Sequence, residues 1–370
     1  MVTLPEIIER DKIIVHVIAR DKFTAGYINF MKLRMTEWEH HFFVAASGIY
    51  DVKPVDERNV HYYSKSREIA KKYRDLLTEC RKIIISGVWD TRLLLSLQKD
   101  FVHKTYLQFW GGDFYGYRFS RIPGIRHPRA SLKWLIRRYL HHRFIKHCAG
   151  TLSLITRDID ELQKIFPSNV KHFTARMPED VLEHHDFTSL ASRRHESSTV
   201  RILAGNSAQR PNDHKGIFES LEHLKDSDIE IVSPLSYGEP DYRNKVITLG
   251  HKIFGDKFKP ITDFIPKAEY VEFLASCDCA VFNYNQQAAL GNIWLMFRLG
   301  KKVWLRENSS MWHDFTAKGA AIYPISELSC VDFEALSAIP DDARNTNIAL
   351  AEERFSGQDA RKEWEAVLND

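Results

Sequence analysis

The sequence predicts an α/β protein with two open parallel-sheet domains, and three observations carry this prediction. Short β-rich runs alternate with amphipathic helical stretches along the chain, a pattern typical of βα units around parallel sheets. The chain has 370 residues, enough for two domains that each bury a core. A polar, Ser/Thr-rich stretch without clear periodicity, residues 186–199, divides the pattern in two. We therefore place the inter-domain linker there and predict domains over residues 1–188 and 199–370.

Each predicted strand is a short apolar run, and each predicted helix has apolar residues three or four positions apart. Strands are predicted over residues 13–18, 41–45, 82–86, 105–109, 150–154, 200–204, 228–234, 257–261, 279–282 and 302–305. Helices are predicted over residues 26–36, 66–77, 91–97, 217–224, 241–254, 266–276 and 290–299. Two such domains joined once leave a cleft between the carboxyl ends of both sheets, where ligands of open α/β sheets bind.

The composition narrows the class of protein. A hydrophobic content of 44%, an aromatic content of 12% and a net charge of +3 are typical of a globular protein. No apolar run reaches the length of about 18 residues that a membrane span needs, and the first residues are too acidic for a signal peptide. The five cysteines lie mostly in apolar runs, and Cys277 and Cys279 lack a second pair at zinc-site spacing. We expect buried free thiols in a reducing cytoplasm.

The turn after the strand at 200–204 has the features of a phosphate-binding site. Gly205 leads from this strand to a helical pattern that begins near Asn212. A helix start leaves backbone N–H groups unpaired and carries the positive end of the helix dipole, and both suit a phosphate. An ordinary β–α turn capped by Asn or Ser explains the same residues equally well. The polar side chains of this turn are Asn206, Ser207, Arg210, His214 and Lys215.

A second helix start follows the strand predicted at 279–282. A polar loop leads to a helix that begins near Gly291 and ends at Gly300, a typical C-terminal glycine. Gly291 lets a ligand approach the backbone closely, so this helix start can also receive an anion. We expect the two helix starts to hold one diphosphate together, with Gln286, Gln287 and Asn292 beside it. The apolar residues of the helix are predicted to pack in the core.

A carboxylate follows the strand predicted at 105–109. Asp113 comes directly after two glycines, which leaves it free to face the cleft. A general base must reach the acceptor hydroxyl there, and the flanking aromatic residues would raise the pKa of Asp113 by excluding solvent. The competing interpretation is a Gly-Gly-Asp turn that Asp113 caps. His16 and Asp21 follow the first strand and are second candidates for the base, with structural roles as the alternative.

A basic segment, residues 118–146, lies between the predicted strands at 105–109 and 150–154. From Phe114 to Arg157 the chain has no acidic residue, and aliphatic and aromatic residues lie among its Lys and Arg residues. A basic amphipathic helix is typical of an element on an anionic membrane surface, where each basic residue contributes about 1 kcal/mol. A helix packed on the sheet with its other face in solvent fits the same pattern. RNA binding is the remaining alternative.

No metal site is predicted. The pair Asp158 and Asp160 opens a helix, where acidic residues favour the helix dipole, and the pair Asp226 and Asp228 lies before a strand. Adjacent histidines at 40–41 and 184–185 point apart in a helix or a strand. The chain also lacks the phosphate loop of NTPases, the serine motif of α/β hydrolases and the glycine fingerprint of dehydrogenases.

Several short motifs together resemble bacterial glycosyltransferase family 56, also called the 4-α-L-fucosyltransferase family. The resemblance extends from about residue 13 to residue 312. The motifs are Gly205-Asn206-Ser207-x-x-Arg210-x-Asn212-x-His214, Gln286-Gln287 with Gly291, Arg306-Glu307-Asn308 with Trp312, Trp110-Gly111-x-Asp113-x-Tyr115, Thr156-Arg157 and Arg176-Met177.

The resemblance implies the GT-B fold, in which two Rossmann-like domains face each other across a cleft. It implies transfer of 4-acetamido-4,6-dideoxy-D-galactose from its TDP form to a lipid-linked disaccharide in enterobacterial common antigen synthesis. It further implies a donor domain at 199–370, an acceptor domain at 1–188, no cofactor besides the nucleotide-sugar donor, and a peripheral protein at the cytoplasmic face of the inner membrane.

Residue roles follow from the same resemblance. Asp113 is the expected catalytic residue. In the GT-B arrangement Tyr237 would lie near the nucleotide, although a plain turn tyrosine fits as well, and Glu307 would accept from a ribose or sugar hydroxyl unless it is a solvated loop charge. The expected donor-binding residues are Asn206, Ser207, Arg210, His214, Tyr237, Gln286, Gln287, Gly291, Asn292 and Glu307. The expected acceptor-binding residues are Trp110, Gly111, Tyr115, Arg176, His16 and Asp21.

We therefore expect a metal-independent hexosyltransferase that acts on a polyprenyl-diphosphate-linked glycan and does not bind nucleic acid. One alternative is a non-catalytic protein that binds a sugar nucleotide or a lipid-linked glycan. A basic RNA-associated protein is the second alternative.

Overall fold

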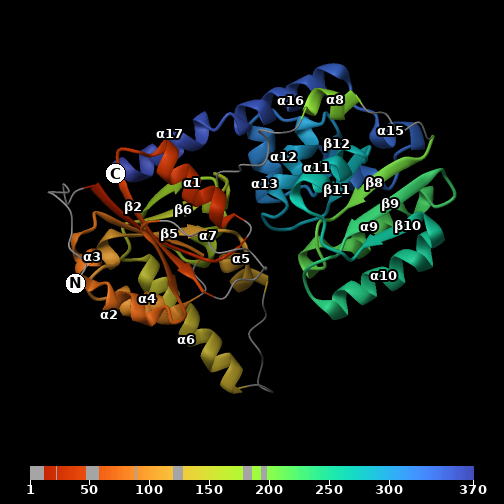
Figure 1. Ribbon diagram of the computed structural model, residues 1–370. Helices are drawn as coiled ribbons and strands as arrows, with labels where there is room; N and C mark the ends of the chain where they lie inside the picture. The colour runs from red at the N-terminus through yellow and green to blue at the C-terminus, as the bar shows by residue number, and fades with distance from the viewer. Residues whose placement is uncertain are drawn as a thin grey trace. The chain divides into compact units, whose positions relative to one another are not determined.

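Figure 1 shows a computed structural model of the protein, which describes residues 12–21, 23–46, 58–87, 90–119, 128–177, 186–192 and 198–370. The chain divides into two compact units. The N-terminal unit comprises Met1–Asp180 together with Gly357–Asp370, and the C-terminal unit comprises Val181–Ser356.

The N-terminal unit contains a seven-stranded parallel sheet with the order β3-β2-β1-β4-β5-β6-β7. All six residues of the central strand β1 are buried, because helices cover both faces of a parallel sheet. The strands are β1 (Ile13–Ile18), β2 (Glu39–Ala45), β3 (Val60–Tyr63), β4 (Lys82–Ser86), β5 (Thr105–Phe109), β6 (Gly150–Ser153) and β7 (Lys171–Thr174). The helices are α1 (Thr24–Arg34), α2 (Arg67–Lys72), α3 (Arg74–Glu79), α4 (Thr91–Leu97), α5 (Gly112–Phe119), α6 (Pro128–Ile145), α7 (Asp158–Ile165) and α17 (Gln358–Asn369).

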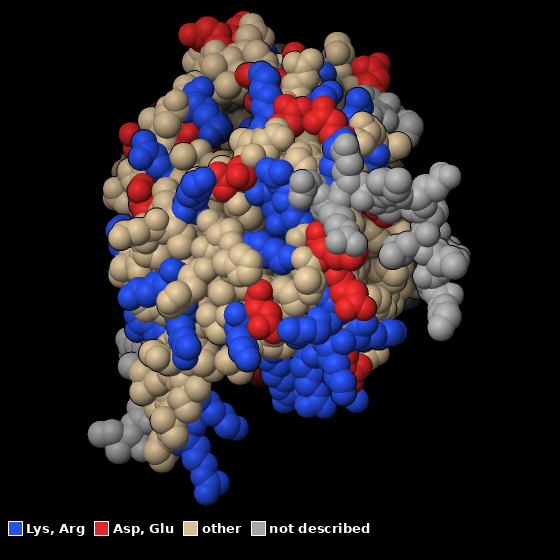
Figure 2. All heavy atoms as spheres, turned by 90° about the vertical axis from the view of Figure 1, so that its left-hand side faces the viewer, with Lys and Arg blue, Asp and Glu red and all other residues tan. Residues whose placement is uncertain are grey.

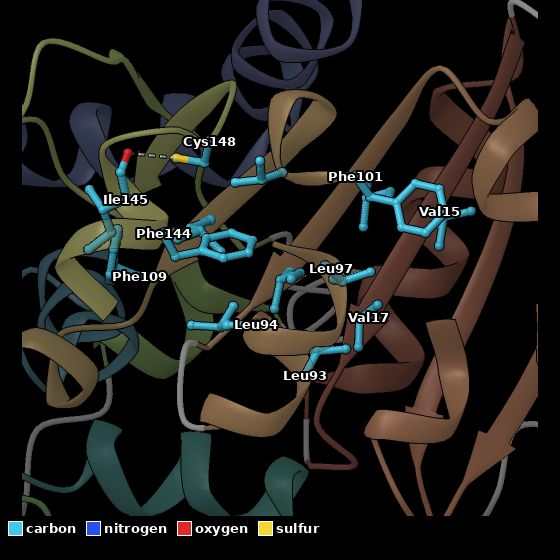
Figure 3. Close-up of a cluster of buried hydrophobic side chains, with 14 of the residues drawn as sticks. Val15, Val17, Leu93, Leu94, Leu97, Phe101, Phe109, Phe144, Ile145 and Cys148 are labelled. Carbon is cyan, nitrogen blue, oxygen red and sulfur yellow. Dashed lines mark hydrogen bonds between the residues drawn. The ribbon is translucent and has the colours of Figure 1, made fainter. Parts of the chain in front are cut away.

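Two hydrophobic cores lie on opposite faces of this sheet, because successive strand residues point to opposite sides. Val15 and Val17 face the core formed with α2 to α7, and Figure 3 shows them with side chains of α4 and with Phe144 of α6. Ile14 and Ile18 face the other core, which α1 and α17 cover.

The predicted assignment of residues 357–370 to the C-terminal domain is wrong. In α17, Trp364 is fully buried in the N-terminal core and its ring lies 5.5 Å from that of Tyr27. Arg176 follows β7 and binds the helix through both ends of one carboxylate: its Nε lies 2.9 Å from Glu363 Oε2 and its Nη2 lies 2.5 Å from Glu363 Oε1. The Trp364 indole donates to the Arg176 carbonyl at 3.0 Å. The apolar face of α17 therefore completes the N-terminal unit.

The C-terminal unit contains a six-stranded parallel sheet with the order β10-β9-β8-β11-β12-β13. Ile202 and Ala204 of β8 pack with Ile217 and Phe218 in one core of this unit. The strands are β8 (Val200–Ala204), β9 (Ile229–Pro234), β10 (Phe258–Ile261), β11 (Cys279–Phe282), β12 (Lys302–Leu305) and β13 (Tyr323–Pro324). The helices are α8 (Phe187–Ser192), α9 (His214–Leu221), α10 (Pro240–Phe254), α11 (Lys267–Ala275), α12 (Leu290–Arg298), α13 (Ser310–Ala317), α14 (Ile325–Leu328), α15 (Phe333–Ser337) and α16 (Asp341–Phe355).

The ten predicted strands are present, and three short strands at sheet edges, β3, β7 and β13, were not predicted. The predicted helix at 66–77 is broken at Tyr73 into α2 and α3. The predicted linker at 186–199 contains α8, whose Phe187 and Leu190 are buried three positions apart. That segment belongs to the C-terminal unit, so it does not form the junction between the two units.

Two further expectations concern cysteines and membrane spans. Cys80, Cys148, Cys277 and Cys279 are buried free thiols, as expected, whereas Cys330 is exposed. Within the described ranges, no helix has the length and apolar character needed to cross a membrane.

A chain of hydrogen bonds runs through the N-terminal core from Tyr27 to the backbone. His16 Nδ1 lies 2.8 Å from the Tyr27 hydroxyl, His16 Nε2 lies 2.9 Å from His40 Nδ1, and His40 Nε2 lies 3.0 Å from the Met35 carbonyl oxygen. Because that oxygen can only accept, His40 Nε2 carries a hydrogen, and the remaining donors follow in order: His16 Nε2 donates to His40 and Tyr27 donates to His16. This order of donors holds because burial lowers the pKa of each imidazole and thereby keeps both rings neutral.

We predict that acid weakens the fold through His40. Burial lowers the pKa of His40 to about 4, whereas the unfolded chain keeps the ordinary value near 6.5. Between these values the unfolded state binds more protons, so the free energy of unfolding falls by up to about 3 kcal/mol as the pH drops from 6.5 to 4. His40→Gln keeps an acceptor for His16 and cannot titrate, so calorimetry should show a smaller loss of melting temperature over this range.

The control for this prediction is His103→Gln, which replaces an exposed histidine. It should lose as much melting temperature as the wild type. An equal loss in the wild type and in His40→Gln would contradict the prediction.

Candidate active site

The turn after β8 lies at the carboxyl edge of the C-terminal sheet, and Gly205 starts it. Gly205 has φ of +69°, and a Cβ atom there would lie 2.7 Å from Asn212 Oδ1 and 2.8 Å from His214 Nε2. Both the backbone conformation and the space therefore require glycine at this position.

Asn212 holds the turn in shape from within. Its side chain is fully buried, its Oδ1 accepts from the Asn206 N–H at 2.8 Å, and its Nδ2 donates to Ser207 Oγ and to the Gln209 carbonyl, each at 3.0 Å. Asn206 and Ser207, two predicted donor-binding residues, are thus fixed by a residue that was not predicted to have a role at the site.

The loop after β11 lies beside this turn, because β11 pairs with β8. The Tyr284 hydroxyl contacts both Asn206 Oδ1 and Asn212 Oδ1. Asn283 Nδ2 donates to Asp213 Oδ2 at 2.8 Å. The Asn206 turn and the loop after β11 are therefore joined by direct hydrogen bonds, whereas the predicted sharing of one diphosphate by the two helix starts remains a prediction.

A cluster of three tyrosines connects these turns to the start of α12. Tyr237, which follows β9, raises the pKa of both Tyr270 and Tyr284 through electrostatic repulsion, after the larger effect of their burial. The Tyr270 hydroxyl accepts from Asn292 Nδ2 at 2.9 Å. Asn292, a predicted donor-binding residue, is thus held by Tyr270, and Tyr237, another, lies near enough to Tyr270 and Tyr284 to affect the pKa of both.

His214 presents an unpaired donor beside Gly205. The Tyr242 hydroxyl accepts from the His214 backbone N–H at 3.3 Å and lies 3.3 Å from His214 Nδ1. A hydroxyl donates one hydrogen bond and accepts up to two, so these contacts fit a hydroxyl that donates to Nδ1 and a ring hydrogen on Nε2. Burial lowers the pKa of His214 to about 4, which keeps the ring neutral. Its Nε2 is buried and has no hydrogen-bond partner among the described residues.

The two predicted anion sites at helix starts differ. Asp213 caps α9: it has φ of +50° and accepts from the Gly216 N–H at 3.4 Å, and Arg306 Nη1 lies 3.7 Å from its Oδ2. A carboxylate therefore already occupies the start of α9. The start of α12 has no side-chain cap, and Ala289 precedes it with φ of +55°. The uncapped N–H groups of α12 are thus the better site for a phosphate.

The glutamines and Gly291 lie around this uncapped start. Gln287 is buried, and its Oε1 has no hydrogen-bond partner within the described parts of the chain. Gln286 and Gly291 are half-buried, and Gly291 lies in the first turn of α12.

Arg210 and Glu307 are engaged with protein groups. Arg210 Nε donates to Glu239 Oε2 at 2.9 Å, and both side chains are exposed. Glu307 accepts from the Ser326 hydroxyl and from the Ser326 backbone N–H at the start of α14. Neither contact is buried, so both side chains keep access to solvent, and their donor-binding roles remain predictions.

In the N-terminal unit, Asp113 lies in the first turn of α5, directly after β5. It is buried, and its carboxylate accepts from the Trp110 N–H at 3.0 and 3.2 Å and from the Phe114 N–H at 3.1 Å. Burial raises the pKa of Asp113 to about 7, although these hydrogen bonds act in the opposite direction. The capping contact is present, and the raised pKa also suits a general base near neutral pH.

The other residues of the Trp110-Gly111-x-Asp113-x-Tyr115 motif each have different contacts. Gly111 has φ of +93°, which allows the tight turn before α5. Trp110 Nε1 is buried without a partner in the described chain, and the Trp110 ring lies 5.6 Å from that of Phe23. Tyr115 is buried in the core and donates to Asp158 Oδ1 at 3.0 Å. Tyr115 thus connects α5 to α7. Because its side chain is buried, the structure does not support its acceptor-binding role, which remains a prediction.

His16, Asp21 and Arg176 have structural contacts. The prediction that His16 follows the first strand is wrong: it lies within β1, and both its ring nitrogens are used in the core. Asp21 accepts from the Phe23 N–H at 2.9 Å and shapes the turn before α1. The Arg176 guanidinium binds Glu363, so it is neutralised by α17.

No metal centre is evident in the described residues, where no three His, Cys, Asp or Glu side chains gather. The chemistry of the C-terminal site is that of an anion site built from an uncapped helix start, a neutral imidazole donor and amide groups. The N-terminal unit supplies a carboxylate with a pKa near neutrality.

Comparison with known proteins gives the fold and the family. The model of the 4-alpha-L-fucosyltransferases, glycosyl transferase group 56, matches residues 18–332. Solved structures that resemble the chain are a UDP-forming α,α-trehalose-phosphate synthase from Burkholderia xenovorans (9% identity, TM-score 0.68, covering 97% of this chain and 99% of that one), and sucrose-phosphate synthase from Thermosynechococcus elongatus (8%, 0.67, 97% and 98%). A glycosyltransferase from Rickettsia africae is also similar (14%, 0.58, 97% and 92%).

At these identities the solved structures establish the fold, which is GT-B, while the match over most of the chain establishes the family. The chain is a glycosyltransferase that belongs to glycosyl transferase group 56.

Proposed function

We propose that the protein transfers a 6-deoxy acetamido hexose such as Fuc4NAc from a TDP-sugar to a hydroxyl of a polyprenyl-diphosphate-linked glycan. The setting would be cell-surface polysaccharide synthesis, such as that of enterobacterial common antigen, at the cytoplasmic face of the inner membrane. The observation that carries the donor side is the uncapped start of α12, which follows the loop whose Tyr284 hydroxyl is hydrogen-bonded to the Asn206 turn.

On the donor side, the diphosphate would accept hydrogen bonds from the first N–H groups of α12 and from His214 Nε2. Gly291 allows it to approach the backbone. Arg210 and Arg306 are half-exposed or exposed cations on the same carboxyl edge and would offset the charge that develops on the leaving nucleotide. These protein charges support a reaction without a metal.

On the acceptor side, Asp113 would take the proton of the acceptor hydroxyl. The acceptor oxygen then forms a bond to the anomeric carbon, and the bond from that carbon to the diphosphate oxygen breaks. Its electron pair leaves with the nucleotide. A carboxylate with a pKa near 7 is a stronger base than an exposed aspartate, and about half of it is ionised at neutral pH.

The membrane part of the proposal is supported by α6. The helix has basic residues along its length and no acidic residue, so an anionic surface attracts it. A polyprenyl-linked acceptor is met at such a surface.

Asp113→Asn tests the general base. The substitution keeps the size of the side chain and removes its basicity, so kcat should fall by about 10² to 10⁴. The wild-type rate should fall as the pH drops below about 7, because Asp113 must be deprotonated to act. The measurement is nucleotide release from TDP-sugar with a lipid-linked acceptor, and nucleotide binding by the variant is the control. Unchanged turnover would remove Asp113 from the mechanism.

His214→Phe tests the donor site. The ring is kept and the unpaired N–H is lost, so TDP should bind about ten- to a hundredfold more weakly, as expected for a lost hydrogen bond to a charged group. Thermal shift against UDP, TDP, GDP and CDP gives the readout, with TDP expected to stabilise the wild type most. Stabilisation by nucleotide without any transfer would favour a non-catalytic binding protein, and no stabilisation by any nucleotide would contradict the donor assignment.

Chelation tests metal independence. The transfer rate in excess EDTA should equal the rate without it, because helix N–H groups and arginines supply the positive potential at the diphosphate. A loss of activity that added Mg²⁺ or Mn²⁺ restores would contradict this part of the proposal.

A further inference from the structure

The helix α6 is attached to the N-terminal unit by one face. His141, Phe144 and Ile145 are buried, and His141 lies between Thr91 Oγ1 at 3.1 Å and the Tyr117 hydroxyl at 3.0 Å. Nearer the start of the helix, the Trp134 ring lies 5.7 Å from that of Tyr117. Trp134, His141 and Ile145 follow the helical repeat, so they form one face directed at the domain.

The opposite face of α6 carries large apolar side chains in solvent. Leu132, Leu135, Ile136 and Tyr139 are 59%, 48%, 49% and 63% exposed. Their spacing of three, four and seven positions puts them on one stripe, and the helical repeat places that stripe on the side away from Trp134 and His141. We call these four residues the α6 stripe. Solvent-exposed stripes of this kind usually mark a binding surface.

The charges around the α6 stripe all have one sign. The helix has no acidic residue. The exposed basic residues that precede, flank and follow the stripe are Arg129, Lys133, Arg137, Arg143 and Lys146. In Figure 1 the first half of α6 projects away from the other helices of the N-terminal unit, and in Figure 2 Lys and Arg side chains gather along the lower edge of the molecule.

The neighbouring helix α4, which packs against α6, also exposes an apolar and a basic side chain. Its Leu95 is 51% exposed, and Arg92 is exposed one turn earlier.

We infer that the α6 stripe inserts among the lipids of an anionic bilayer, with the basic residues at headgroup level. This deepens the membrane part of the proposed function: contact is made by apolar insertion as well as by charge. Stripe-to-stripe pairing of two copies of this chain would bring the basic residues of both helices together and is disfavoured by repulsion. Three of the four stripe residues are aliphatic and cannot stack on bases, which disfavours RNA.

The test is flotation of the full chain with vesicles of phosphatidylcholine alone and of phosphatidylcholine with phosphatidylglycerol. The wild type should bind the anionic vesicles, and part of this binding should persist in 0.5 M salt, which screens charge and leaves insertion intact. Leu135→Ser/Ile136→Ser should bind about tenfold more weakly and lose the salt-resistant part. Arg129→Gln/Lys133→Gln should bind more weakly by about fivefold per charge and keep a salt-resistant part.

Leu33→Ser is the matched control, because Leu33 is 73% exposed on α1 of the same unit; it should bind as the wild type does. Wild-type binding by Leu135→Ser/Ile136→Ser would overturn the inference. So would a wild type that floats with neither vesicle but dimerises through the stripe in sedimentation velocity. The flotation experiment contains no sugar nucleotide. A negative flotation result therefore does not bear on the transfer reaction, and a negative transfer assay does not bear on membrane insertion.

Discussion

The buried amide of Asn212 is the interaction on which the shape of the turn after β8 depends. One side chain pairs with the backbone of Asn206, the hydroxyl of Ser207 and the carbonyl of Gln209, and it meets Tyr284 from the neighbouring loop. Its partners come from two turns that are about 70 residues apart and that the parallel sheet brings to one edge. This amide and the His214 ring pack so closely against Gly205 that they leave no room for a Cβ atom there.

The molecule also shows how one residue type serves two purposes. His16 and His40 have both ring nitrogens satisfied and contribute a fixed polar chain to the core. His214 is equally buried and neutral, yet its Nε2 has no hydrogen-bond partner among the described residues. A buried donor without a partner is unfavourable in an isolated protein and is expected where a ligand completes the hydrogen bond.

Sequence reasoning succeeded where the information is local. The runs of β1, β4, β5, β8, β11 and β12 are continuous and apolar, so their bounds were predicted correctly. Contacts between residues that are far apart in the sequence leave no pattern in the sequence from which they can be predicted. Nothing near Arg176 indicates that Glu363 neutralises it 187 positions later, and nothing in the α17 sequence assigns it to the other unit. Tyr284, Asp213 and Arg306 were missed for the same reason, although Tyr284 and Arg306 each lie within two residues of a predicted strand end.

The return of α17 to the N-terminal unit has a consequence for synthesis. Trp364, Val367 and Leu368 fill a core whose other members are made more than 180 residues earlier. On the ribosome, the first unit therefore emerges with an apolar surface uncovered while the whole second unit is still being translated. That surface is a natural substrate for chaperones, and maturation of the first-made half must wait for the last-made helix.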